Sequence, residues 1–431
     1  MSIYTDNMFS AEELEKIREQ FFYVDKDYYG RERLFFDNAG GSLRLKAAEE
    51  EFHRVDSIPD ASEHSNSLAK ELKALEDLGR KDLKEVIFNA KSGTIYPSYT
   101  ASQIAMEVIR VITENAKGTN IVTTRLEHPS VYDAATLYSQ MHGLELRVAD
   151  VNKETGGVDT ASIIDLIDEG TCLLCCMAAS NISGYIYETA RICAEARKKN
   201  PDIYIYVDAV QHAPHASLDP EVWGADAMSF APYKFFGVRG FGAAWLSDRV
   251  STFVHHRLLG KKANDWEIGS PATAQFAAFT KIVDYVVSLG ASEALPDRSR
   301  RKLFEAGMKR IADHERGLLY MMLEGVNGEP GLRHIPGVTV QMDGKDLYTR
   351  DLILGVEFEN LSCEQAVAEY EKRGVISFER ALTSMYSKRM VEAFDSKGMV
   401  RLSPLHVNTP EDICRFLQIT QALAESGGQS L

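Results

Sequence analysis

The sequence is poor in three features that would place it in other classes of protein. Among its 431 residues no run of consecutive apolar residues approaches the roughly 18 that a membrane span needs. Positive charge is also scarce, because 63 acidic residues face 48 basic ones and leave a net charge of −15. A nucleic-acid partner would require the opposite sign, so we expect neither a membrane nor a nucleic acid as partner.

Cysteine is sparse as well, with six residues in the chain. Cys172 and Cys175 form a CxxC pair, but no second pair or nearby histidine completes a zinc set, so no metal site is expected. The first residues are polar and acidic and show no apolar signal segment. We therefore expect a cytoplasmic protein whose thiols are reduced and sit in its core.

Hydrophobic patterning indicates an α/β protein with a mostly parallel sheet. Apolar, strand-like runs alternate with amphipathic helical patterns up to about residue 294, and longer charged helices then surround a few strands. We expect an N-terminal segment (1–45) packed on the small domain, a large domain (46–294), and a smaller α+β domain (295–431). The expected strands are 120–124, 144–150, 172–177, 203–207, 226–230, 242–246, 338–342 and 354–358; the expected helices are 66–89, 101–116, 130–142, 159–168, 187–199, 297–325, 362–373 and 410–425.

Polar residues follow the ends of these predicted strands. In parallel sheets the carboxyl ends of the strands form the ligand-binding edge, so such residues should converge on one crevice. The N-terminus of the helix predicted from residue 101 should reach the same place. The converging residues are Thr100, Ser102, His128, Asn181, Asp208, Gln211, Tyr233 and Lys234.

Each of these residues also has a purely structural interpretation. Asp208 could close a turn, Lys234 could extend to solvent along its apolar stem, and Thr100 could simply cap a helix. Together, however, the residues match the needs of pyridoxal phosphate. A carboxylate keeps the pyridine nitrogen protonated, a lysine holds the aldehyde as a Schiff base, and a helix N-terminus binds the phosphate. A histidine would stack on the ring, and amides would bond its phenolic oxygen.

The motifs resemble those of the class V aminotransferase family of fold-type-I pyridoxal-phosphate enzymes. This family includes cysteine desulfurases, selenocysteine lyase, kynureninase and isopenicillin N epimerase-like proteins. The resemblance extends from FFDNAGGSL (35–43) to VRLSPLHVNTPEDI (400–413). It is carried by VDAVQ (207–211) and SFAPYKFFGVRGFG (229–242), with support from EHPS (127–130), SNISG (180–184) and DWEIGSP (265–271).

The resemblance implies a role for each matching residue. Lys234 corresponds to the Schiff-base lysine, Asp208 to the pyridinium partner and His128 to the stacking histidine, and these three are the expected catalytic residues. The other expected cofactor contacts are Thr100, Ala101, Ser102, Asn181, Gln211, Tyr233 and Ser270. Ser270 matches a position that reaches the partner subunit's phosphate, which implies a homodimer. Arg401 and Asn38 are the expected substrate contacts, with Arg401 clamping an α-carboxylate.

The chain departs from the desulfurase pattern at two places. Desulfurases of this family usually carry histidine before the lysine, where this chain has Tyr233, as kynureninase-like members do. The persulfide cysteine should lie within residues 374–404, and this span contains no cysteine. A persulfide relay needs a thiolate. Sulfur delivery to a cluster scaffold is therefore not expected.

The expected function is a pyridoxal-phosphate enzyme that acts on a small α-amino acid. A lyase or desulfurase-like elimination without a persulfide cysteine is favoured, and an aminotransferase or an epimerase is the alternative. A non-catalytic, vitamer-binding regulator would need neither Asp208 nor an arginine clamp. From spacing alone, Arg401 could instead be a surface residue paired with Glu411 or Asp412.

Overall fold

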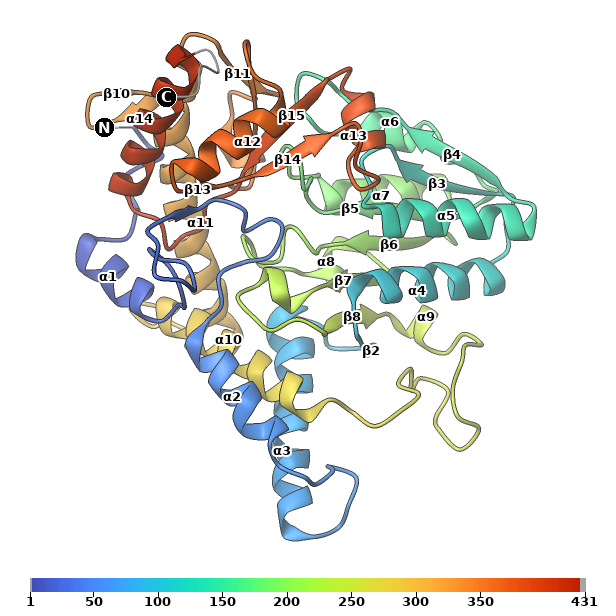
Figure 1. Cartoon of the computed structure of the whole chain (residues 1–431). Coiled ribbons are helices and arrows are strands. Elements are labelled where there is room, and N and C mark those ends of the chain that lie inside the picture. Colours follow the sequence, from blue (N-terminus) through green and yellow to red (C-terminus); the bar gives the residue numbers. More distant parts are fainter. Residues whose placement is uncertain (1, 427–431) are drawn as a thin grey trace.

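The computed structural model describes residues 2–426 and contains one large, seven-stranded sheet (Figure 1). Its strand order is β2-β8-β7-β6-β5-β3-β4, and all neighbours are parallel except β8, which runs antiparallel to β2 and β7. The predicted mostly parallel sheet is therefore confirmed. The strands are β2 (Thr94–Ser98), β3 (Asn120–Thr124), β4 (Glu145–Ala149), β5 (Thr171–Met177), β6 (Tyr204–Asp208), β7 (Ala227–Phe230) and β8 (Gly242–Leu246).

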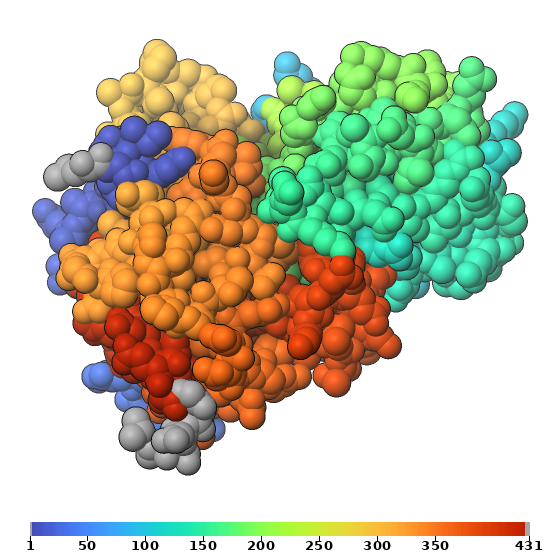
Figure 2. Space-filling model, turned by 90° about the horizontal axis from the view of Figure 1, so that it is seen from above, coloured from blue at the N-terminus to red at the C-terminus, as the bar shows by residue number. Residues whose placement is uncertain are grey.

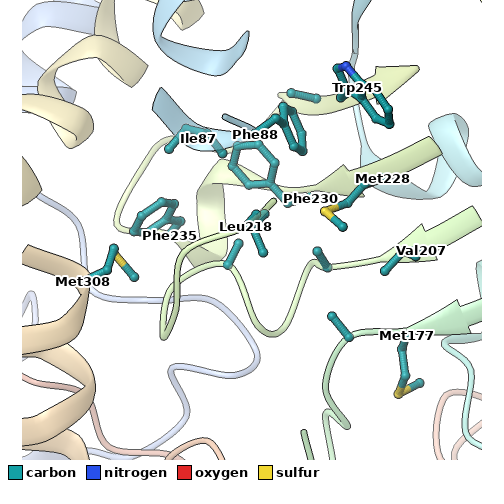
Figure 3. Close-up of a cluster of buried hydrophobic side chains, with 14 of the residues drawn as sticks. Ile87, Phe88, Met177, Val207, Leu218, Met228, Phe230, Phe235, Trp245 and Met308 are labelled. Atoms are coloured by element: carbon teal, nitrogen blue, oxygen red, sulfur yellow. The ribbon is translucent and has the colours of Figure 1, made fainter. Parts of the chain in front are cut away.

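Helices cover both faces of this sheet. On one face, α4 (Ala101–Asn115) and α5 (Pro129–His142) pack on inward-facing side chains that include Leu173 and Tyr206. On the other face, α6 (Thr160–Ile164) and α7 (Thr189–Lys199) join a larger apolar cluster. Figure 3 shows part of that cluster, in which Val207, Met228, Phe230 and Trp245 lie together with Phe88 and Phe235. The strands that carry the polar residues are thus held rigidly between two apolar layers.

A group of long helices flanks the sheet on the side of β2. The predicted helix 66–89 is shorter than expected, since α3 (Ser67–Lys81) passes into a π-helical segment, η1 (Asp82–Ile87). The other helices are α2 (Lys46–Asp56), α10 (Thr273–Gly290) and α11 (Arg300–Glu324). Where α10 crosses α11, a Cβ on Gly290 would lie 1.9 Å from the carbonyl oxygen of Leu303. Glycine therefore permits this close helix crossing.

The C-terminal part contains a separate antiparallel sheet of order β11-β12-β15-β14. Sequence patterning located β11 and β12, indicated only Met399 and Val400 of β15 as strand-like, and missed β14. In Figure 2 the orange and red surface of this part abuts the green surface of the large sheet. The elements are β11 (Val338–Gln341), β12 (Leu354–Phe358), α12 (Cys363–Lys372), β13 (Val375–Ile376), β14 (Phe378–Ala381), α13 (Lys388–Ala393), β15 (Gly398–Leu402) and α14 (Pro410–Ser426). The remaining short elements are α8 (Pro220–Trp223), α9 (Asp248–Ser251), β9 (Gly325–Val326), β10 (Glu329–Pro330), η3 (Leu332–His334) and η4 (Leu347–Thr349).

The N-terminal segment contacts this C-terminal part at several points. Helix α1 (Ala11–Glu19) begins with a capping box, formed by Ser10 and Glu13. Arg18 on α1 pairs with Asp412 at 3.0 Å, and strand β1 (Leu34–Phe35) runs parallel to β13. The division of the chain at residues 45 and 294 stays a proposal. Within residues 2–426, no helix combines the length and the apolar character that a membrane crossing requires.

Candidate active site

A cavity of about 190 Å³ opens at the carboxyl ends of the large sheet's central strands. It brings together residues that are far apart in the sequence and that were predicted to converge. Those lining it are Thr100, Ala101, Ser102, His128, Asn181, Asp208, Gln211, Tyr233 and Lys234. The expected convergence of these residues is therefore present in the structure, whereas the function of the cavity and the chemical role of each residue stay predictions.

Lys234 is held inside this cavity by the short 3-10 helix η2 (Pro232–Lys234), which follows β7. The residue is 8 % exposed, so its side chain does not extend to solvent. Its Nζ donates a long hydrogen bond of 3.5 Å to Oε1 of Gln211. Burial, assisted by the charge of Arg401, lowers the pKa of Lys234 to about 7. A lysine with such a pKa supplies a neutral, nucleophilic amine near pH 7.

Asp208 is the last residue of β6, and its side chain lies in the same cavity. Its Oδ1 accepts the backbone N–H of Val210 at 2.9 Å, so the turn interpretation is also correct. Burial raises the pKa of Asp208, because a carboxylate loses its hydration in this site. A cationic ligand group beside it, such as a protonated pyridine nitrogen, would offset that cost and favour the ionised form.

The N-terminus of α4 forms one wall of the cavity. Thr100 is the N-cap, and its Oγ1 accepts the backbone N–H of Gln103 at 3.1 Å, as its sequence position predicted. A Cβ on Gly242 would lie 2.6 Å from the backbone nitrogen of Ala101, so glycine lets β8 approach this helix start. Free backbone N–H groups and the positive end of the helix dipole make this wall suited to a phosphate.

His128 caps the N-terminus of α5 and lines the cavity through its ring. Its Nδ1 accepts the backbone N–H of Ser130 at 3.2 Å. Burial and nearby cationic side chains, Lys234 foremost, lower the pKa of His128 to about 3. The imidazole is therefore neutral near pH 7, a state suited to stacking on an aromatic ring.

Arg401 lies within β15 and is 3 % exposed, so it is not a surface residue. Neither Glu411 nor Asp412 is its partner among the described residues. Asp412 pairs with Arg18. Instead Nη2 of Arg401 contacts Oδ1 of Asp37 at 2.6 Å. Its Nη1 donates to the carbonyl oxygen of Asn181 at 3.2 Å, which links the arginine to the cavity wall.

Asn38, the other predicted substrate contact, has its side chain engaged within the protein. Its Nδ2 donates to the carbonyl oxygens of Phe35 and Ser403, and its Oδ1 accepts the N–H of Leu43. These bonds fix the glycine-containing turn that carries Asp37. A direct contact between Asn38 and a substrate stays a prediction.

Ser270 lies outside this cavity, on the segment between α9 and α10. The segment extends away from the large sheet as an arm in Figure 1. Ser270 is exposed, and so are the apolar residues Val254, Leu259 and Ile268 of the same arm. Its predicted contact with the phosphate site of a second subunit stays a prediction.

Sequence reasoning missed four charged residues at or near the site. Arg239 lines the cavity, and its guanidinium lies 4.4 Å from the ring centroid of Tyr233. Glu127, which directly precedes His128, is fully buried, and desolvation raises its pKa to about 8. Asp37 and Arg380 both flank Arg401. Asp37, Glu127 and Arg239 lie inside the quoted motifs, which could have pointed to them, whereas Arg380 lies in no quoted motif and carried no such signal.

The residues present fit pyridoxal phosphate. One observation independent of the motifs is the buried Oδ1 of Asn181, which has no hydrogen-bond partner among the described residues although the side chain lines the cavity. A ligand with polar groups would satisfy such an atom. Asp208, Lys234 and the start of α4 offer the groups needed for a ring nitrogen, an aldehyde and a phosphate. When bound, this cofactor supplies an electron sink for a negative charge formed at a substrate carbon.

Comparison with known proteins agrees with this class of site. The family model described as aminotransferase class-V matches residues 34–416. A probable cysteine desulfurase of Streptomyces coelicolor is 26 % identical over 329 residues, covering 69 % of this chain and 76 % of the relative. A probable cysteine desulfurase of Synechocystis sp. is 22 % identical over 427 residues, covering 94 % of each.

Two solved structures share the fold. The cysteine desulfurase of Thermococcus onnurineus NA1 superposes with a TM-score of 0.79 at 19 % identity, covering 96 % of this chain and 98 % of that one. Cysteine desulfurase CsdA of Escherichia coli gives a TM-score of 0.78 at 17 % identity, covering 97 % and 99 %. The protein is thus a fold-type-I enzyme of the pyridoxal-phosphate class. Its chain belongs to the aminotransferase class-V family.

Proposed function

We propose that this enzyme binds an α-amino acid and eliminates a group from its side chain, as a lyase or desulfurase-like enzyme without a persulfide cysteine. The observation that carries the proposal is the position of Lys234 in a cavity that also contains Asp208 and is linked through Asn181 to Arg401. Lys234, Asp208 and Arg401 match the aldehyde of the cofactor, its ring nitrogen and the carboxylate of the substrate.

Each residue has a separate task in this proposal. Asp208, ionised beside a protonated ring nitrogen, maintains the electron-withdrawing power of the ring. Lys234, whose pKa of about 7 leaves much of its amine neutral, accepts the α-proton at Nζ and can return it later. Arg401 orients the substrate through its carboxylate, so that the breaking bond is fixed relative to the ring.

The distribution of cysteines supports an elimination that does not use a protein persulfide. No cysteine is among the described residues that line the cavity. Residues 374–404 form β13, β14, α13 and β15 without any cysteine. Cys363 begins α12, and burial raises its pKa to about 12, so it is not a thiolate at neutral pH. The names of the relatives, cysteine desulfurase, favour a sulfur-containing substrate all the same.

An aminotransferase reaction is the second candidate, and an epimerase the third, because the residues described here serve the first steps of all three. A non-catalytic role would leave the buried Arg401 without a purpose, and it also conflicts with the family of the chain. We further propose a homodimer as the working unit, in which the arm carrying Ser270 contacts the second subunit.

Product analysis tests the proposal directly. The holoenzyme should be incubated with a panel of amino acids that includes cysteine, and the products should be identified by mass spectrometry. Elimination predicts ammonia, a keto acid and the released side-chain group, which is sulfide when the substrate is cysteine, with water consumed and no need for an acceptor keto acid. A desulfurase-like course would give alanine and sulfide only when an external thiol is added as the reductant. Product formation that depends strictly on an added keto acid would identify an aminotransferase and refute the elimination.

A further inference from the structure

Arg380 and Arg401 form a pair of buried guanidinium groups next to the cavity. They lie on neighbouring strands, where Arg401 is opposite Phe378 and Arg380 is opposite Met399. In antiparallel strands this register places the two arginines diagonally on the same face. Nη2 of Arg380 and Nη1 of Arg401 each donate to the carbonyl oxygen of Asn181 at 3.2 Å.

The two arginines carry more positive charge than the neighbouring carboxylates neutralise, and more hydrogen-bond donors than the neighbouring acceptors satisfy. Arg380 and Arg401 are 4 % and 3 % exposed, and Asp37 contacts Arg401, whereas no carboxylate among the described residues pairs with Arg380. The Nε atoms of both arginines are buried and have no hydrogen-bond partner among the described residues. A buried cation without a counter-charge is costly, so this arrangement favours the binding of another anion.

Asp37 is held in place by the local backbone. The backbone of Asp37 forms an isolated parallel β-bridge with Ser403, the residue directly after β15. The carbonyl oxygen of Asp37 also accepts the N–H of Gly40 at 3.0 Å. A Cβ on residue 40 would lie 2.6 Å from Oδ2 of Asp37, so glycine is needed for the carboxylate to rest there. The Asp37 side chain is 21 % exposed, whereas that of Arg401 is 3 % exposed. Asp37 therefore lies on the open side of the arginine.

We propose that Arg380 and Arg401 together form one carboxylate-binding site, and that Asp37 occupies it in the unliganded enzyme as a built-in competitor. A substrate carboxylate would replace Asp37 at Nη2 of Arg401 and take up the unused donors. Two carboxylates cannot share the position cheaply, because like charges repel strongly where water is scarce. Asp37 thereby keeps the arginines paired in the free enzyme and weakens the binding of every carboxylate that enters.

The identification of the entering carboxylate with a substrate rests on the proposed function, but the anion site itself does not. Acetate is a suitable probe because it carries one carboxylate and no amine, and acetamide is its neutral counterpart. Binding of each to the holoenzyme should be measured by titration calorimetry at constant ionic strength. Proteins to compare are the wild type, Asp37→Asn, Arg380→Gln, Arg401→Gln and the double variant Asp37→Asn/Arg401→Gln.

The expected result has an unusual sign, since loss of an active-site carboxylate should strengthen binding. Asp37→Asn should bind acetate at least about tenfold more tightly than the wild type, with acetamide unaffected. Arg380→Gln and Arg401→Gln should each weaken acetate binding, and the double variant should lose the gain. Asp343→Asn is the matched control, because Asp343 also pairs with an arginine, at 2.6 Å, but lies outside the cavity.

Two outcomes would overturn the inference. One is an Asp37→Asn protein that melts normally and binds acetate no more tightly than the wild type. The other is a gain of affinity that persists in the double variant, which would show that Arg401 is not the group for which the carboxylates compete. Neither outcome would affect the proposed elimination, which is tested separately by the products formed from amino acids.

Discussion

Lys234 lies in the electrostatic field of Arg401, and burial together with that guanidinium lowers the pKa of the lysine to about 7. Lys234 ends the short helix η2 that follows β7 of the large sheet, whereas Arg401 lies in β15 of the C-terminal sheet, far away in the chain. Their proximity prepares an amine that is substantially neutral at physiological pH. It also means that the carboxylate clamp and the cofactor lysine influence each other's chemistry.

This relationship predicts the pH dependence of cofactor attachment. Below pH 7 the amine of Lys234 is protonated and cannot attack the cofactor's aldehyde, so the rate of reconstitution should fall about tenfold per pH unit. Above pH 7 the rate should level off. Stopped-flow absorbance after mixing cofactor-free protein with pyridoxal phosphate would measure this profile.

Arg401→Gln tests whether the charge of Arg401 contributes to the lowered pKa of Lys234. Removing the positive neighbour should raise the pKa of Lys234 and shift the midpoint of the profile to higher pH. A midpoint near 10 in the wild type would contradict the lowered pKa of Lys234.

The lowered pKa of Lys234 also makes the free energy of unfolding depend on pH. Between pH 7 and about 10.4 the unfolded chain binds the lysine proton and the folded protein does not, so the cofactor-free protein should become more stable as pH rises. Lys234→Met should lose this part of the slope.

Asp208→Asn should cut turnover by on the order of 10² or more, because an amide cannot hold the ring nitrogen in its protonated form. Steady-state kinetics with whichever amino acid proves to be the substrate would measure the loss. The visible absorbance should show that the cofactor is still bound. A variant with a nearly normal rate would reduce Asp208 to the turn residue that its bond with Val210 also makes it.

Arg401→Lys keeps the charge but loses the planar fork of donors. We expect kcat/KM for an α-amino acid to fall by roughly 10²-fold or more, equivalent to about 3 kcal/mol, with the cofactor's absorbance unchanged. Arg333→Lys is a suitable control, since Arg333 pairs with Asp343 away from the cavity. If Arg401→Lys has normal kinetics, or if an amine without a carboxylate is the better substrate, the amino-acid assignment is wrong.

The arm that carries Ser270 predicts a dimer. Its exposed apolar residues, such as Leu259, which is 97 % exposed, should be covered by a second copy of the chain. Sedimentation velocity should therefore give a particle of twice the chain mass. Leu259→Glu should weaken the association and, with it, cofactor retention. Monomers that keep full cofactor occupancy would disprove both the dimer and the role of Ser270.

Much of the large sheet could be predicted from sequence because its central strands are buried on both faces. Continuous apolar runs such as CLLCCM in β5 stand out, and the parallel arrangement then brings Asp208 and Lys234 to one edge. In the C-terminal sheet this signal is weak. Strand β14 is the short edge segment FERA, with two charged residues, and it was missed. In β15 only Met399 and Val400 are strand-like, and Arg401 was expected at the strand's end although it lies within the strand.

The partners of charged residues could not be predicted from sequence, because they are set by tertiary packing. Spacing offered Glu411 and Asp412 for Arg401, yet the fold gives Asp412 to Arg18 and places Asp37, from near the start of the chain, on Arg401. Arg380 was missed for the same reason. Its contact with Asn181 exists only once β14 packs against the segment that follows β5.

The central claim is that Lys234 holds pyridoxal phosphate covalently, and reduction with borohydride tests it most directly. The purified protein should be yellow, lose its visible absorbance on reduction, and carry the cofactor's mass on the peptide that contains Lys234. Lys234→Ala should show no labelled peptide. Label on a different lysine, or a reduced protein without any bound cofactor, would contradict the account.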